Sequence, residues 1–212
     1  MSFRMRAALL TVALLFLTPF TAQAVSAGDW ILRIGVSNVS PNDSSGDLSG
    51  APGGQVAVDG DTQPSVNITY MLSDRVGIEL LASLPFTHDI NGAGNLAGAG
   101  KIGESSQLPP TLSIQYHFSP LASARPYVGA GLNYTTFFSE STTGALAGTS
   151  LKLDDSFGMA VQAGIDVDIN QNWFWNAEVR YIQISTTATT ALGTVDVDID
   201  PWVFTLGVGT TF

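Results

Sequence analysis

The sequence predicts an all-β protein, an eight-stranded antiparallel transmembrane β-barrel with long extracellular loops. Three observations favour this fold: residues 202–212 alternate strictly, seven further segments alternate in the same way, and the chain begins with a secretory signal. Because successive side chains of a strand point to opposite faces, residues 202–212 place bulky apolar groups on one face and small or polar groups on the other. A soluble barrel would turn the bulky face inward. Here we expect lipid to cover it.

The N-terminal segment has the three parts of a signal peptide. Arg4 and Arg6 precede the apolar run 7–17, and the small-residue triplet 22–24 follows it. We expect cleavage after Ala24, with residues 1–24 removed and residues 25–212 forming one barrel domain. A retained membrane anchor is the alternative, but the apolar run falls short of the roughly 20 residues that a spanning helix needs.

Composition narrows the functional classes. The chain has a net charge of −10, and its charged fraction of 12% is about half of the usual 25%. So acidic a protein is a poor partner for nucleic acid, whose phosphates require lysine and arginine. The sequence contains no cysteine, which excludes disulfides and thiolate metal sites. We predict neither a cofactor nor a bound metal.

Period-two alternation bounded by turn residues predicts eight strands. In chain order these are 30–39, 65–72, 76–86, 111–118, 126–138, 157–169, 174–185 and 202–212. The connections alternate between short turns and long segments rich in Gly, Ser, Thr, Asp and Asn. The short ones are 73–75, 119–125 and 170–173, and the long ones are 40–64, 87–110, 139–156 and 186–201. Short turns are typical of the periplasmic rim and long loops of the outside, so both termini should be periplasmic. A short helix within 142–152 is weakly indicated.

One parity of these strands carries no charge and should face lipid. Its members include Ile34, Ile68, Leu80, Ile114, Leu132, Val161, Val179 and Leu206. Arginine or lysine at mid-depth of a barrel wall costs about 2–4 kcal/mol, so an uncharged band is what a lipid-facing surface requires. Aromatic residues such as Tyr70, Trp173 and Trp202 lie near strand ends, where headgroups are expected. A soluble β-sandwich or lipocalin-like barrel is the alternative interpretation.

The other parity predicts a polar plug in the periplasmic half of the lumen. Its expected members are Arg33, Glu79, Gln115, Asp166, Glu178 and Arg180. Buried charges require partners, so we expect the two arginines to bridge the three carboxylates. Because an eight-stranded barrel has little room beyond its own side chains, this plug should block a straight aqueous path. The pattern therefore argues against a general porin.

Towards the outer rim the lumen parity becomes apolar. The predicted lining of a hydrophobic channel is Val39, Leu81, Phe137, Ile182, Ile184, Val197, Ile199 and Val203. Apolar residues around a water-accessible mouth indicate a funnel for apolar molecules. The alternative is that they pack against the long loops as an outer core. Pro85 lacks an N–H and is a candidate for a lateral gap in the wall, although it could simply end its strand.

Three segments carry a family resemblance. Residues 30–36 followed by 39–41, the strand 125–135 and the closing segment 200–212 resemble the OmpW/AlkL family of outer-membrane barrels. The resemblance implies an eight-stranded barrel in the outer membrane of a Gram-negative bacterium, embedded in lipid and lipopolysaccharide. It also implies a hydrophobic channel that releases small apolar compounds sideways into the bilayer. A last strand ending on Phe212 resembles those that the barrel-assembly machinery recognises.

Two functions follow as hypotheses, and enzymatic activity is disfavoured. The first is passive uptake of small hydrophobic molecules through the apolar funnel. The second is a structural or interaction barrel whose acidic loops bind cations, lipopolysaccharide or other partners, with hard oxygen ligands at 154–155 and at Asp196, Asp198 and Asp200. His88 and His117 are the two histidines, and no G-x-S-x-G motif accompanies them. We therefore predict that the protein is not an enzyme.

Overall fold

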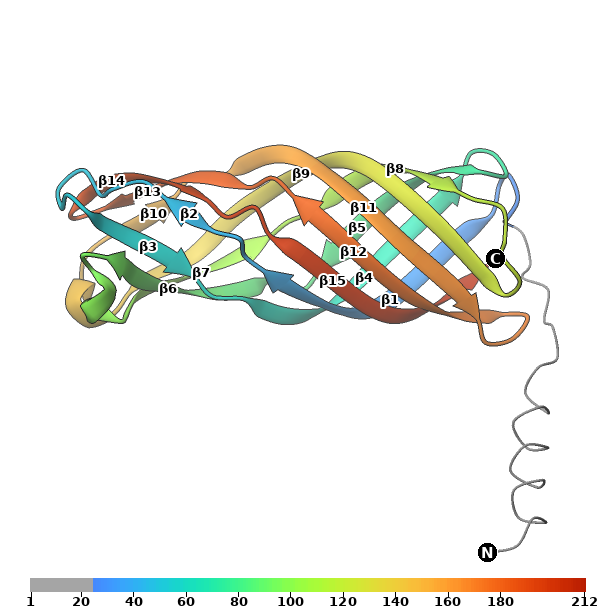
Figure 1. The fold of residues 1–212 in the computed structure, drawn as a ribbon, viewed down its shortest axis with the longest axis horizontal. Helices are drawn as coiled ribbons and strands as arrows, with labels where there is room; N and C mark the ends of the chain where they lie inside the picture. The colour runs from blue at the N-terminus through green and yellow to red at the C-terminus, as the bar shows by residue number, and fades with distance from the viewer. Residues whose placement is uncertain (1–24) are drawn as a thin grey trace, which may run out of the picture.

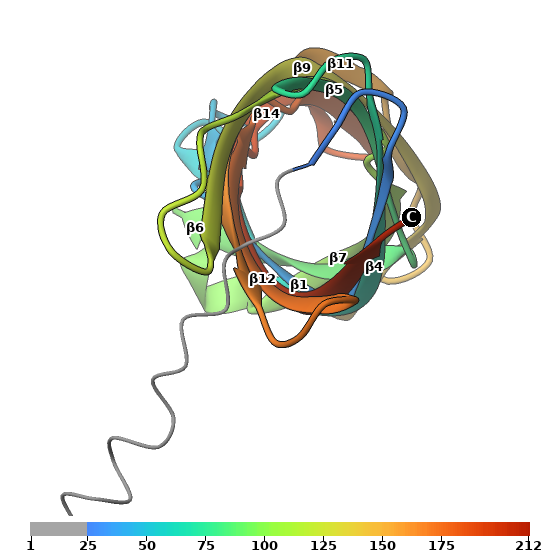
Figure 2. The same ribbon diagram turned by 90° about the vertical axis from the view of Figure 1, so that its right-hand side faces the viewer.

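Eight long strands close into an antiparallel barrel in the computed structural model, which describes residues 25–212 (Figure 1). The predicted signal peptide, residues 1–24, lies outside the described residues. The wall strands are β1 (Trp30–Ser40), β4 (Asp61–Met71), β5 (Val76–Ser83), β8 (Thr111–His117), β9 (Ala124–Thr142), β11 (Ser156–Asp168), β12 (Trp173–Ile182) and β15 (Trp202–Thr211). Pairing of β9 with β11 and of β1 with β15 closes the ring that Figure 2 shows end-on. The predicted eight-stranded barrel is confirmed.

The long connections, which were predicted as loops, contain further strands. They hold β2 (Ser44–Ser45), β3 (Gly54–Val58), β6 (Phe86–Gly94), β7 (Lys101–Leu108), β10 (Leu151–Leu153), β13 (Ser185–Thr190) and β14 (Gly193–Asp198). Strands β3, β6 and β7 continue the sheet from β9, and β10, β13, β14 and β2 form a second sheet. Together they lengthen the wall beyond the end that carries the long connections (Figure 1).

Helical structure in the described residues is confined to short 3₁₀ turns, η1 (Ala97–Ala99) and η2 (Gly144–Leu146). The second turn lies within residues 142–152, for which the sequence weakly indicates a short helix. The helix there is a single 3₁₀ turn. Between residues 25 and 212, no helix combines the length and the apolar character needed to cross a membrane.

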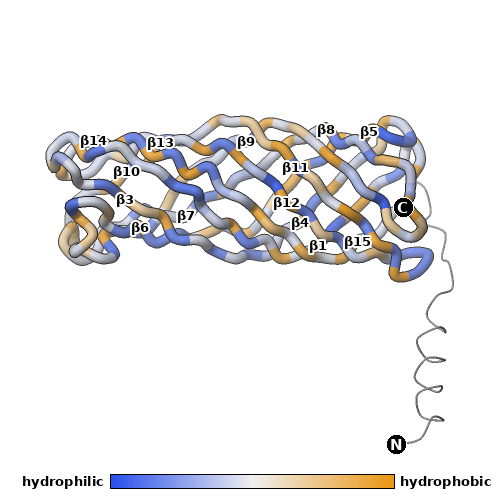
Figure 3. The backbone as a smooth tube through the Cα atoms, viewed as in Figure 1, coloured by the Kyte–Doolittle hydropathy of each residue, from blue (hydrophilic) through white to orange (hydrophobic). Residues whose placement is uncertain are grey.

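The two faces of the wall differ as the alternation predicts. In β15, the side chains of Phe204 and Leu206 are 52% and 69% exposed, whereas those of Val203 and Thr205, which alternate with them, are 5% and 7% exposed. Hydrophobic and hydrophilic residues alternate along the strands in the same way (Figure 3). In a bilayer the exposed apolar residues would contact lipid, and the alternate residues of each strand point into the lumen.

Glycine makes room for aromatic rings inside the narrow lumen. Gly164 in β11 lies directly opposite Tyr127 in β9, and Gly209 in β15 lies opposite Phe174 in β12. A Cβ at either glycine would collide with atoms of the facing ring. These pairs let two large rings fill the lumen at the end with short turns, where the polar residues gather.

Candidate functional site

The lumen near the short turns is closed by a network of buried ion pairs. Arg33 donates from Nε and Nη2 to the two carboxylate oxygens of Asp166, at 3.0 and 2.8 Å. Its Nη1 donates to Thr69 at 3.1 Å and lies 3.8 Å from Glu79. The guanidinium also sits 4.5 Å above the Tyr127 ring. Both charged heads of this two-point pair are therefore held in a fixed orientation across the lumen.

A second arginine ties the other two carboxylates together. The Nη2 atom of Arg180 lies 2.6 Å from Glu79 and 2.9 Å from Glu178, and its Nε donates to Glu178 at 3.1 Å. Gln115 donates to Oε2 of Glu79, and Gln162 donates to Oε1, the oxygen that Arg180 also contacts. The structure thus brings together all six residues predicted for the plug, each of them buried.

Neutral side chains connect the two arginine centres. The Tyr127 hydroxyl donates to Glu178 at 2.9 Å, and Asn176 donates to Tyr127 at 2.9 Å and to Asp166 at 2.8 Å. His117 stacks on Tyr127 and bonds Gln115 through Nε2 at 3.1 Å. Most polar atoms of the network are paired, although Arg180 Nη1, His117 Nδ1 and Gln162 Oε1 have no hydrogen-bond partner. The buried side chains fill this part of the lumen and leave little room for a straight aqueous path.

Above the plug the lumen becomes apolar. A single cluster of buried side chains joins the wall to the strands of the extension, and it comprises Val39, Leu48, Phe86, Leu153, Ala160, Ile182, Ile184, Ala188, Val195, Val197, Ile199 and Val203. Residues 195–199 alternate in agreement with the predicted inward positions of Val197 and Ile199: Val195, Val197 and Ile199 are buried, and Asp196 and Asp198 are exposed. The lumen therefore changes from ionic to apolar along its axis.

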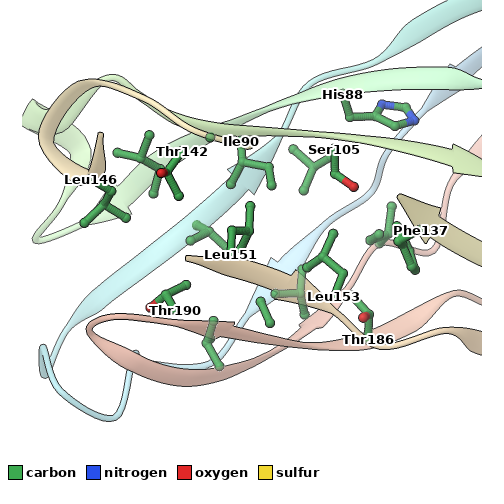
Figure 4. A pocket seen from close by; sticks show the side chains of 18 of the residues that line it. His88, Ile90, Ser105, Phe137, Thr142, Leu146, Leu151, Leu153, Thr186 and Thr190 are labelled. Atoms are coloured by element: carbon green, nitrogen blue, oxygen red, sulfur yellow. The ribbon is translucent and has the colours of Figure 1, made fainter. Parts of the chain in front are cut away.

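The extension encloses a cavity within this apolar region. The centre of a water-sized sphere can occupy about 50 Å³ of it, and all the space between its side chains, open solvent included, amounts to about 720 Å³ (Figure 4). Leu48, Val56, Ile90, Ile102, Leu151 and Leu153 are among the residues around it, as are Ala188, Val195 and three of the predicted lining residues, Phe137, Val197 and Ile199. Four other predicted residues, Val39, Ile182, Ile184 and Val203, belong to the adjoining apolar cluster. Leu81, the last of the eight, is a buried residue of β5.

One corner of the cavity is polar, and the sequence analysis did not identify it. His88 on β6 lies directly opposite Ser105 on β7, and Gln107 is two residues further along β7. All three side chains are buried and line the cavity. The His88 ring bonds the Asp59 carbonyl through Nδ1 at 2.6 Å and Gln107 Nε2 through Nε2 at 2.9 Å. Burial lowers the pKa of His88 below its usual value, so its ring is neutral at pH 7.

The wall is interrupted beside the cavity. The ladder between β5 and β8 ends at the pair Leu81–Thr111, and the ladder between β6 and β7 begins at Phe86–Gln107. Between these pairs lie Pro85 on one side and Pro109 with Pro110 on the other. We call this stretch the proline gap. Proline has no N–H to donate to a neighbouring strand, which explains why pairing stops here.

One edge of the proline gap, formed by Pro109 and Pro110, is held in place by Asn133 of β9. The amide of Asn133 donates to the carbonyls of Pro109 and Pro110 at 3.1 and 3.2 Å, and to Thr111 at 3.0 Å. The Tyr134 N–H also donates to the Pro110 carbonyl at 3.1 Å, so side-chain and backbone bonds together hold this edge to β9. The structure places Pro85 between β5 and β6, so it ends one strand and precedes the next.

The acidic residues of the extension mostly bind neighbouring side chains and backbone. Asp155 accepts from the Tyr134 hydroxyl at 2.6 Å, and this hydrogen bond lowers the pKa of Asp155. Asp200 accepts from the Tyr181 hydroxyl and the Ile184 N–H, at 3.0 and 3.1 Å. Within residues 25–212, no group of three or more acidic or histidine side chains is arranged to hold a metal ion.

Comparisons with known proteins agree with this architecture. A model of the OmpW family matches residues 26–212. The chain is 47% identical to outer membrane protein W of Vibrio cholerae, over 87% of this chain and 89% of that protein. It is 31% identical to outer membrane protein AlkL of Ectopseudomonas oleovorans, over 92% of this chain and 86% of the other. The crystal structure of outer membrane protein OprG from Pseudomonas aeruginosa is similar with a TM-score of 0.81 and 41% identity, covering 90% of this chain and 99% of that one. The protein is thus an outer-membrane β-barrel of Gram-negative bacteria and belongs to the OmpW family.

Proposed function

We propose that the protein is a passive channel for small hydrophobic molecules, which enter the apolar cavity from outside and leave sideways into the bilayer. The observation that carries the proposal is the order of features along the lumen, with an apolar cavity on the outer side of a buried ionic network. A molecule that reaches the cavity meets the plug below it. Its remaining route runs through the wall.

The cavity supplies a driving force that does not depend on the exact shape of the ligand. Transfer of apolar surface from water is favourable by about 25 cal/mol per Å². Aliphatic and aromatic side chains such as Ile90, Phe137 and Ile199 line the cavity from several strands. Such a lining favours hydrocarbons and weakly polar aromatics, and disfavours ions and sugars, which would lose their hydration.

The proline gap is the exit that we propose. It lies where the extension meets the membrane-spanning wall, between Leu81 of β5 and Phe86 of β6. Widening a wall at a place with no ladder breaks no strand-to-strand hydrogen bonds between the two edges. Release at this level also spares an apolar molecule the aqueous periplasm below.

Neighbouring substitutions on β13 test the path. Ala188 lines the cavity, whereas the adjacent Thr189 is exposed on the outer face. We expect Ala188→Asp to reduce uptake of radiolabelled naphthalene by cells several-fold, because a charge in the cavity disfavours an apolar ligand. Ala188→Phe should reduce it by filling the space. Thr189→Asp adds the same charge outside and should leave uptake unchanged.

The comparison requires equal amounts of folded protein in the outer membrane. These are measured by electrophoresis of unheated samples, in which the folded barrel forms a band separate from the more slowly migrating denatured barrel. Uptake that stays at the wild-type rate in both Ala188 variants would exclude this cavity as the path. Equal losses in the Ala188→Asp and Thr189→Asp variants would point to a general charge effect, and so would also count against the proposal.

A further inference from the structure

An unpaired hydrogen-bond acceptor stands at the polar corner of the cavity. The side chain of Gln107 is 1% exposed and lines the cavity, and its Oε1 atom has no hydrogen-bond partner. A buried acceptor without a donor is disfavoured by its lost hydration, so a site that retains one is suited to a ligand that supplies the donor. The strand extension thus contains one polar feature that the packing of its apolar core does not explain.

The orientation of the Gln107 amide follows from its neighbours. His88 Nδ1 lies 2.6 Å from the Asp59 carbonyl oxygen, which can only accept, so this nitrogen carries the proton of the neutral ring. His88 Nε2 is therefore an acceptor, and it takes a hydrogen from Gln107 Nε2 at 2.9 Å. The Gln107 amide is fixed by this bond, with Oε1 as its free end. His88 acts here as a positioning residue.

The hydroxyl groups around the cavity already donate to backbone carbonyls, and that of Ser105 in the polar corner donates to Ser106 at 3.4 Å. Thr142, Thr186 and Thr190 donate to backbone carbonyls of Thr149, Asp154 and Gly193, at 2.8, 2.6 and 3.0 Å. None of these bonds involves Gln107. The donor that would satisfy Oε1 must therefore come from a bound molecule or from water.

We propose that the cavity selects apolar molecules that carry one hydrogen-bond donor, such as an aromatic or aliphatic alcohol, over hydrocarbons of the same size. Gln107 Oε1 accepts the hydrogen of the ligand, and the apolar residues enclose its body. This inference rests on the proposed function and narrows its substrate class. A net hydrogen bond of ordinary strength corresponds to a preference of about threefold to tenfold.

A matched pair of ligands tests the preference. The compounds 2-naphthol and 2-methylnaphthalene share a ring system, and a hydroxyl in one replaces a methyl of similar size in the other. Binding to the protein in lipid nanodiscs is measured by equilibrium dialysis. Uptake by empty nanodiscs is subtracted, and affinity is expressed against the concentration in lipid, so that the difference in hydrophobicity between the compounds cancels.

We expect the wild-type protein to prefer 2-naphthol by about threefold to tenfold. The Gln107→Leu variant should lose this preference and keep its affinity for 2-methylnaphthalene, because it removes the acceptor and preserves the volume. Gln107→Met serves the same purpose if the leucine variant does not fold. Gln183→Leu, which replaces an exposed glutamine on the outer surface, should behave as wild type.

Each outcome decides between the two proposals. Equal affinity of the wild type for the two compounds would overturn the inference and leave the proposed channel intact. A preference that survives in both Gln107 variants would also overturn it, because the donor would then be recognised elsewhere or by water. Binding of neither compound above the level of empty nanodiscs would contradict the proposed function itself.

Discussion

Removal of Arg180 should lower the free energy of unfolding more than any surface substitution, because it leaves two buried carboxylates without their cation. Its side chain is 1% exposed and makes close contacts with Glu79 and Glu178 at 2.6 and 2.9 Å. In the Arg180→Leu variant, Arg33 alone remains to balance those two residues and Asp166, and Arg33 is 3.8 Å from Glu79. Breaking a buried ion pair from one side typically lowers the free energy of unfolding by about 3–5 kcal/mol.

A compensated variant separates charge from packing. In the triple variant Glu79→Gln, Glu178→Gln and Arg180→Met, the stranded charges are gone and the volumes are similar. Replacing a whole buried ion cluster by neutral groups is often tolerated, so this variant should be more stable than Arg180→Leu. Arg75→Leu is the control, because Arg75 is exposed at a short turn and bonds Tyr116 and Ser119 at 3.3 Å. Its loss should be within about 1 kcal/mol.

The measurement is equilibrium unfolding in guanidinium, with the protein reconstituted in lipid vesicles and followed by tryptophan fluorescence. Trp175 and Trp202 lie on the exposed outer face and report the loss of the lipid environment. A destabilisation below about 1 kcal/mol in the Arg180→Leu variant would refute the reasoning, since the stranded carboxylates would then be solvated or protonated at little cost. A triple variant as unstable as the single one would show that packing, and not charge, dominates.

Three further predictions concern the pH response, the packing and the exit. Burial holds the pKa of His88 below its usual 6.5, so the unfolded chain binds the proton first, and the free energy of unfolding should fall as the pH drops below about 6.5. His88→Phe should reduce this dependence, and an unchanged pH profile would refute the assignment. Gly164→Ala should destabilise the barrel by about 1–3 kcal/mol in the same unfolding assay, because the new methyl collides with the Tyr127 ring. Gly98→Ala has open space around it and should lose far less. Replacing the three prolines of the gap by alanine should lower naphthalene uptake several-fold by allowing the strands to pair, whereas Pro120→Ala at a short turn should not; equal uptake by both variants would exclude the gap as the exit.

The wall strands could be predicted because the bilayer imposes a strict pattern on them. Lipid requires an uncharged outer face, and a narrow lumen requires small or paired polar groups on the other, so the period-two signal in residues 202–212 is strong. The residues of the plug could be predicted for the same reason. The strand alternation places Arg33 and Glu79 on inward-facing positions of their strands, and therefore in the same lumen. Their partners follow from charge, but the bidentate contact of Arg33 with Asp166 depends on the register across the barrel, which the sequence does not contain.

The strands beyond the membrane could not be predicted, because water relaxes the pattern there. β6 and β7 are rich in Gly, Ser, Asn and charged residues, and their outer faces contact no lipid. Such segments have the composition of loops. β6 and β7 supply six of the residues that line the cavity. The hydrogen bond between His88 and Gln107 joins these two strands, whose register shifts between Ile90 and Asn91. β14 is the exception, since its alternating valines and aspartates predicted its inward face.

A single extra residue at Pro85 links the gap, the cavity and its polar corner. Between the pairs Leu81–Thr111 and Phe86–Gln107, four residues on one edge face three on the other. Because faces alternate at every residue, this mismatch changes which parity points inward: Leu81 is buried below it, and Phe86 and His88 are buried above it. Continuous alternation through Pro85 would have turned Thr87 and Asp89 to the lumen and His88 to the outside. The irregularity that interrupts the wall is therefore also what places a neutral histidine, and through it the free oxygen of the Gln107 amide, at the edge of an otherwise apolar cavity.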